Sequence, residues 1–332
     1  MTERDRFEPE TEPLLVPIAA DAPAGASLRY DPVFLQLRQA REEDDASLPM
    51  GEWERPLKKA DWRAVASQCA GLLSSRSKDL QLAAWLCEAW TRQHRMDGFA
   101  AGVRLLNGLV DRFWDSVYPQ IEDGDVELRA APLNWVGAKL VVPVKYVPVT
   151  SSGLTYARYE ESLRVGYEKD AVADDKRRAR ESAIEAGMLT AEAFEEAKQA
   201  TPIEFWERVE AKLREPSAAL DALIRTATEK FGESDAPNCS PLREILDAIS
   251  HTVGMFIRQR RLESEQIPGG GMAADFMGEM PELPASVASV VEPVYAGSAA
   301  AAAATAAAPA RRSSAGAELA SSEDAIARIM EA

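Results

Sequence analysis

The sequence predicts an all-α protein with two helical regions, and three observations support this fold class. Several segments repeat apolar residues at steps of three and four, the spacing of one face of an α-helix. Many of these segments begin with a capping residue or with a proline at the first helical position. The segment richest in β-branched residues, LVVPVKYVPVT at 140–150, contains two prolines, which a central β-strand does not tolerate.

We divide the 332 residues into four parts. Residues 1–150 form an N-terminal helical domain with an extended lead-in, and residues 151–267 form a middle helical region. Residues 268–320 are rich in Ala, Pro and Gly, so we expect a disordered linker there. Residues 321–332 begin a helical pattern too short to be stable alone, the expected start of an apparently missing C-terminal region.

The first predicted helix lies in YDPVFLQLRQARE, where Asp31 is the expected N-cap and Pro32 the first helical residue. An acidic loop, 42–56, follows it. The second predicted helix starts after the N-cap Asp61, and its apolar positions form one buried face. These positions are Trp62, Val65, Cys69 and Leu72.

Two further helices are predicted within 79–119. The first, DLQLAAWLCEAW, is apolar on more than one face, so neighbouring helices should enclose it. The second carries one apolar stripe and should end at Pro119. We expect one core in this domain, built from Trp62, Leu72, Leu80, Trp85, Leu86, Val103, Leu106 and Phe113.

The remaining elements are also predicted from apolar spacing and capping residues. VELRAAPLNWVGAKL is a helix with Pro132 near its start, and the 140–150 segment is extended. Residues 174–187 form a charged, exposed helix, and Thr190 caps the next one. Pro216 should break or kink the helix that contains it, and Ser240 should cap the last helix.

Charge and hydropathy exclude several function classes. The net charge of −16 opposes sequence-independent binding to nucleic acid and docking on an anionic membrane. No apolar run approaches the ~20 residues of a membrane span, and the N-terminus has no apolar signal core. The cysteines Cys69, Cys87 and Cys239 are far apart in sequence, so we expect reduced, buried thiols in a cytoplasmic protein.

The sequence contains no pattern of residues that an enzyme would need. His94 and His251 have no second histidine at ligand spacing, and we expect helix-end and core roles for them. EDGDVE, at 122–127, has acidic residues at alternating positions, Asp123, Asp125 and Glu127, but Leu128 follows where the calcium-loop pattern needs glycine, which favours a solvated turn. No phosphate loop and no nucleophile elbow occur, so we expect no catalytic residue, no metal site and no cofactor.

The four polar residues RSKD, at 76–79, separate two apolar helical segments. They are interpreted as the capped joint between two buried helices; a catalytic or ligand-binding turn is the alternative. Ser75 or Ser77 can cap the helix that follows, and Asp79 suits the positive end of its dipole. Lys78 does not suit that dipole, which favours a specific partner for its ammonium group.

Several motifs in order closely resemble the ImpA N-terminal domain, which defines the TssA proteins of bacterial type VI secretion systems. They are GASLRYDPVF, PLKKADWRAV, RSKDLQLAAWLCEAW and GFAAGVRLLNGLVDRFWDSVYPQIEDGD. The resemblance singles out motif residues with structural or interaction roles. These are Arg29, Tyr30, Asp31, Asp61, Trp62, Arg76, Ser77, Lys78, Asp79, Leu80, Trp85, Trp114 and Pro119.

The resemblance implies a cytoplasmic, non-enzymatic scaffold that organises the contractile tail. Its implied partners are baseplate, tube, sheath and membrane-complex proteins, with neither nucleic acid nor direct membrane insertion. Members of the resembled family form rings through their C-terminal region. Only the first residues of such a region, 321–332, are present here, so we expect this 332-residue chain to be a monomer or weak dimer. The alternative functions are a metal-dependent enzyme or another helical adaptor with an unrecognised site.

Overall fold

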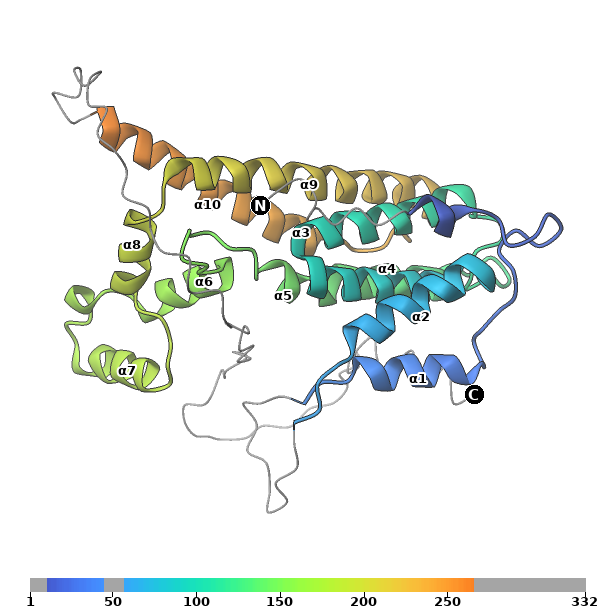
Figure 1. The fold of residues 1–332 in the computed structure, drawn as a ribbon, viewed down its shortest axis with the longest axis horizontal. Helices are drawn as coiled ribbons and strands as arrows, with labels where there is room; N and C mark the ends of the chain where they lie inside the picture. Colours follow the sequence, from blue (N-terminus) through green and yellow to red (C-terminus); the bar gives the residue numbers. More distant parts are fainter. Residues whose placement is uncertain (1–10, 45–56, 266–332) are drawn as a thin grey trace, which may run out of the picture.

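The computed structural model describes residues 11–44 and 57–265, and the fold is all-α over these ranges (Figure 1). Two short 3₁₀ segments and ten α-helices follow one another in this part of the chain. They are η2 (Glu12–Leu15), α1 (Pro32–Arg41), α2 (Trp62–Ser75), α3 (Leu80–Arg112), α4 (Glu127–Lys139), α5 (Val141–Val144), α6 (Tyr156–Val165), η3 (Glu168–Asp170), α7 (Asp174–Glu185), α8 (Ala191–Gln199), α9 (Ile203–Phe231) and α10 (Ser240–Glu265). The predicted fold class is therefore confirmed.

The predicted caps of three helices are present. Asp31 caps α1 by accepting a hydrogen bond from the Val33 N–H, and Asp61 caps α2 by accepting one from Ala64. Thr190 caps α8 in the same way. Each side chain satisfies a backbone donor that has no partner within the helix.

Helix α3 is a hairpin of two helical stretches. Arg95 has φ 55° and ψ −129°, and the chain reverses there. After the reversal Gly98 lies against the backbone of Trp90, and Gly102 lies against Cys87. In one straight helix, residues 87 and 102 would be about 22 Å apart at 1.5 Å per residue. The two helices predicted within 79–119 therefore exist as antiparallel neighbours.

Several predicted boundaries were wrong. The second stretch of α3 ends at Arg112 and not at Pro119, because the chain turns at Phe113 and directs carbonyl groups toward Arg129. Pro132 lies inside α4 instead of near its start. The 140–150 segment is not wholly extended, since Val141–Val144 form one helical turn, α5.

Two proline and cap predictions in the middle region also differ from the structure. Helix α9 continues through Pro216, which is itself buried, with core residues on both sides of it. Packing of this buried face holds the helix together across the missing hydrogen bond. Helix α10 begins at Ser240, whose N–H donates to the Asn238 side chain 3.0 Å away, so Ser240 is not the cap.

Helices α9 and α10 lie along α3 and α4, while α6, α7 and α8 gather at one end of the molecule (Figure 1). One cluster of buried apolar side chains extends from Leu14 on η2 to Ile257 on α10. Seven of the eight predicted core residues are buried, and Trp62 packs partly buried against them. Helix α7 buries no residue, as its charged sequence predicts.

The predicted division at residue 150 stays a prediction. The predicted linker, 268–320, and the predicted start of a further region, 321–332, lie outside the described residues. Within the described ranges, no helix combines the length and the apolar character that crossing a bilayer requires.

Candidate functional site

The RSKD joint is the point where three distant chain segments meet. The N–H of Lys78 donates to the carbonyl of Ala24 at 2.8 Å, and Ala26 donates to Arg76 at 3.0 Å. On the other side, Tyr118 donates to the carbonyl of Lys78 at 2.9 Å, and Leu80 donates to Tyr118 at 2.9 Å. The joint therefore connects the lead-in with the turn that follows α3.

The partner of Lys78 is the backbone of its own chain. The buried Nζ donates to the carbonyl of Leu14 at 2.7 Å and to that of Leu73, in the last turn of α2, at 2.5 Å. Burial lowers the pKa of Lys78 to about 8. The ammonium group satisfies one carbonyl at the end of α2, where helical partners are missing, and one carbonyl of η2.

The cap of α3 is Asp79 and neither Ser75 nor Ser77. Asp79 Oδ1 accepts hydrogen bonds from Gln81 N–H at 2.7 Å and Leu82 N–H at 3.4 Å. The Ser75 hydroxyl donates to Gly71 within α2, and Ser77 is fully buried. Burial raises the pKa of Asp79 to about 7, although both backbone bonds act in the opposite direction.

The motif residues of the lead-in support the same joint. Asp31, the cap of α1, also pairs with Arg76 at 2.7 Å. The Arg29 guanidinium lies over the ring of Tyr30, which is 73% exposed. Gly25 has φ +72°, and a Cβ atom there would lie 2.2 Å from the carbonyl oxygen of Arg76. Only glycine lets the lead-in approach the joint this closely.

The turn between α3 and α4 depends on Arg129, which the sequence analysis missed. This buried guanidinium donates to the carbonyls of Trp114 at 2.5 Å, Val117 at 2.8 Å and Pro119 at 2.8 Å. It also lies 5.0 Å from the ring of Trp114. Arg129 shares a helical face with the buried Leu133 and Val136, and this spacing was the available signal.

Arg41 is a second structural residue that the sequence did not predict. Its guanidinium lies between two indole rings, 5.1 Å from the centroid of Trp85 and 4.8 Å from that of Trp135. It pairs with the buried Glu88 at 2.8 Å. The last turn of α1 is thereby fixed to α3 and α4.

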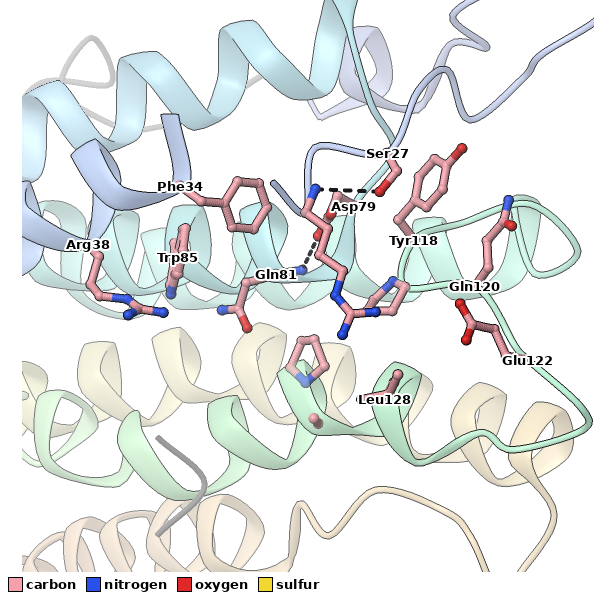
Figure 2. Close-up of a pocket in the computed structure, with 14 residues that line it drawn as sticks. Ser27, Phe34, Arg38, Asp79, Gln81, Trp85, Tyr118, Gln120, Glu122 and Leu128 are labelled. Carbon is pink, nitrogen blue, oxygen red and sulfur yellow. Dashed lines mark hydrogen bonds between the residues drawn. The ribbon is translucent and has the colours of Figure 1, made fainter. Parts of the chain in front are cut away.

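Beside the joint lies a cavity of about 240 Å³, the α1–α4 cavity, between α1, the start of α3, the 118–122 turn and α4 (Figure 2). Four of the predicted motif residues contribute to its lining: Arg29, Asp79, Trp85 and Pro119. The other lining residues were not predicted as site residues. They are Ser27, Phe34, Arg38, Gln81, Tyr118, Gln120, Glu122, Leu128, Ala131 and Pro132.

Other predicted motif residues lie away from this cavity. Asp61 and Trp62 are at the start of α2, where the Trp62 indole N–H donates to Glu43 at 3.0 Å and the Arg92 guanidinium lies over its ring. Leu80 is fully buried in the core. Trp114 packs edge-on against Phe231 of α9, with ring centroids 4.8 Å apart.

The described residues hold no group of three or more His, Cys, Asp or Glu side chains arranged to bind a metal ion. Asp125 of the EDGDVE turn accepts a hydrogen bond from the first N–H of α4, at Glu127. His251 is exposed on α10 and is not the core residue we expected. All three thiols are free and buried, and burial raises their pKa values, that of Cys239 to about 11.

Comparison with known proteins identifies the N-terminal domain. Residues 15–138 match the family model "ImpA, N-terminal, type VI secretion system". A 146-residue stretch is 31% identical to the type VI secretion system component TssA1 of Pseudomonas aeruginosa, covering 42% of this chain. The matched part spans 41% of the length of that relative.

A solved structure has the same fold. It is the N-terminal domain of the TssA component of the type VI secretion system from Burkholderia cenocepacia, including its conserved ImpA_N region. The TM-score is 0.65 at 27% identity, covering 78% of this chain and 98% of the solved one. Residues 15–138 are therefore an ImpA N-terminal domain, the domain of the TssA components of type VI secretion systems.

Proposed function

We propose that this chain is a non-enzymatic structural component of the type VI secretion tail, which organises baseplate, tube and sheath assembly through protein contacts. Its partners are baseplate, tube, sheath and membrane-complex proteins, and it works in the cytoplasm. It acts within a homo-oligomeric assembly, as the family resemblance implies for full-length members.

The main support for this proposal is that the charged motif residues make structural contacts within the fold. Lys78 and Asp79 are the charged groups at the centre of the motif, and both are buried and bonded to backbone groups. Arg76 pairs with the cap of α1. A reacting group needs access to substrate in a competent geometry. These residues instead build the fold, which agrees with a scaffold better than with an enzyme.

Recovery of tail proteins tests the proposal. The full chain, carrying an affinity tag, is expressed in a bacterium that has an active type VI secretion system, and the recovered proteins are identified by mass spectrometry. We expect the tagged chain to recover baseplate or sheath subunits. The control is the same tagged chain unfolded by the double substitution Trp85→Ala and Leu86→Ala, which should recover none. A folded bait that recovers no tail protein would contradict the proposed function.

A further inference from the structure

We propose that the α1–α4 cavity binds a short extended peptide of a partner protein. In this complex an apolar side chain of the peptide fills the cavity, and an adjacent acidic residue lies against Arg38. The inference rests on the proposed function, because it names the chemistry of one contact that an assembly component would make.

The size of the cavity favours a single anchoring side chain. Sites for cofactors and drug-sized ligands occupy roughly 300–1,000 Å³. The α1–α4 cavity has a volume of about 240 Å³. Protein interfaces often concentrate their binding free energy in one aromatic or aliphatic side chain that enters a pocket of the partner.

Much of the cavity wall is apolar, and it is held in place by contacts with the rest of the fold. Phe34 and Trp85 form one wall with their ring centroids 5.3 Å apart, and Pro119 and Pro132 contribute to the lining. Arg129 fixes the carbonyl of Pro119, and Asp79 fixes the start of α3. A site that is already ordered loses little conformational entropy when it binds.

The charges around the cavity set the chemistry and direction of the peptide. Arg38 of α1 and Glu122 of the 118–122 turn lie at opposite ends of the site (Figure 2). Arg29 adds a second guanidinium to the lining, while Asp79 uses Oδ1 to cap α3. A guanidinium carries five N–H donors, so Arg38 can bind a carboxylate in addition to its existing contacts. Glu122 disfavours an acidic residue at the other end.

This local charge differs from that of the whole chain. The net charge of −16 repels acidic partners in general, whereas the cavity lining sets two arginines, Arg29 and Arg38, against two carboxyl groups, Asp79 and Glu122. Charge complementarity therefore favours an acidic flank on the Arg38 side over a basic one.

A random dodecapeptide library displayed on phage, selected against the immobilised full chain, tests the proposed chemistry. We expect enriched peptides to share an aromatic or leucine-sized residue next to Asp or Glu. The most enriched peptide is then synthesised with a fluorescent label, together with a version in which Lys replaces the acidic residue. Fluorescence anisotropy should give the acidic version at least tenfold tighter binding.

Two variants then locate the site. Ala131→Phe fills the cavity from α4 and should abolish binding, and Arg38→Glu should weaken binding of the acidic peptide at least tenfold while improving that of the Lys version. The matched control is Arg178→Glu on α7, an exposed helix without buried residues, which should bind like the parent. Circular dichroism shows whether each variant is folded. If either Ala131→Phe or Arg38→Glu does not fold, the binding measured for the other variant decides whether the cavity is the site.

Failure to enrich any peptide, or enriched peptides insensitive to both folded variants, would overturn the inference. If enriched peptides show no preference for an acidic residue but lose their binding to Ala131→Phe, the proposed acidic contact with Arg38 is wrong. Recovery of tail proteins by the full chain separates the two proposals. If Ala131→Phe and Arg38→Glu recover the same tail proteins as the parent, the cavity inference fails while the proposed function stands.

Discussion

Buried cations at the RSKD joint and in α4 act on backbone carbonyls. Lys78 donates to Leu14 and Leu73, and Arg129 donates to three carbonyls around the turn after α3. An unsatisfied buried carbonyl costs about 1–3 kcal/mol, so each cation satisfies several groups that would otherwise destabilise the fold. Single residues therefore hold segments that lie far apart in sequence.

Trp85 should be essential for stability. It is 4% exposed, packs against Phe34 and stacks on Arg41. Truncating it to alanine should lower the free energy of unfolding by about 3–5 kcal/mol, as for other buried aromatic residues. Urea unfolding followed by circular dichroism measures this, and Tyr30→Ala, at a 73% exposed site, is the control. A melting temperature of Trp85→Ala within a degree of the parent's would show that neighbouring helices do not enclose the first stretch of α3.

Asp79 should make stability depend on pH. Burial raises its pKa from 3.8 to about 7 in the folded state. The folded protein then holds the proton more tightly than the unfolded chain, so stability falls as pH rises from about 4 to about 7. Asp79→Asn keeps a capping oxygen and removes this titration. The free energy of unfolding of the variant, relative to the parent, should increase by at least ~1 kcal/mol between pH 5 and pH 8, since one pKa unit corresponds to ~1.4 kcal/mol. An unchanged difference at both pH values would contradict the buried titration.

At the scale of elements, the hairpin in α3 depends on close contact between its two stretches. A Cβ atom at Gly98 would lie 2.0 Å from the carbonyl oxygen of Trp90, and one at Gly102 would lie 2.6 Å from the Cα of Cys87. Backbone atoms cannot yield as the end of a flexible side chain can. Glycines at these positions therefore let the two stretches pack as they do.

Gly98→Ala should be strongly destabilising. Overpacking in a well-packed interior costs about 1–3 kcal/mol, and here the clash is with backbone. The matched control is Gly71→Ala in α2, where a Cβ atom would meet nothing within 4 Å. Because alanine favours helix interiors over glycine by ~0.5–1 kcal/mol, this control should be neutral or stabilising. Thermal melting compares the two, and equal melting temperatures would refute the close packing of the hairpin.

At the scale of the whole molecule, the apolar core crosses the predicted boundary at residue 150. Helix α9 packs along α3, and the buried cluster includes residues of both predicted regions. Separate domains would each need a core of their own. The interface between α3 and α9 therefore couples the N-terminal and middle regions.

We expect the full chain to unfold in one cooperative transition. Far-ultraviolet circular dichroism reports all helices, and near-ultraviolet circular dichroism reports aromatic packing, including Trp206 and Trp85, which are buried in the middle and N-terminal regions. The two urea curves should coincide. Leu223→Ala in α9, at a 1% exposed site, should shift both curves equally. Two separate transitions would instead support independent domains that meet near residue 150.

The sequence by itself determined the fold class and the caps Asp31, Asp61 and Thr190, because apolar spacing and capping are local properties of the chain. Its ordered motifs also revealed the resemblance to the ImpA N-terminal domain. Only the tertiary structure decided how α3 folds back at Arg95, why α9 continues through Pro216, and which residues surround the α1–α4 cavity. The physical reason is that these features depend on contacts between distant segments. A buried cation such as Arg129 finds its carbonyls only after the chain has folded, and packing then outweighs local preference.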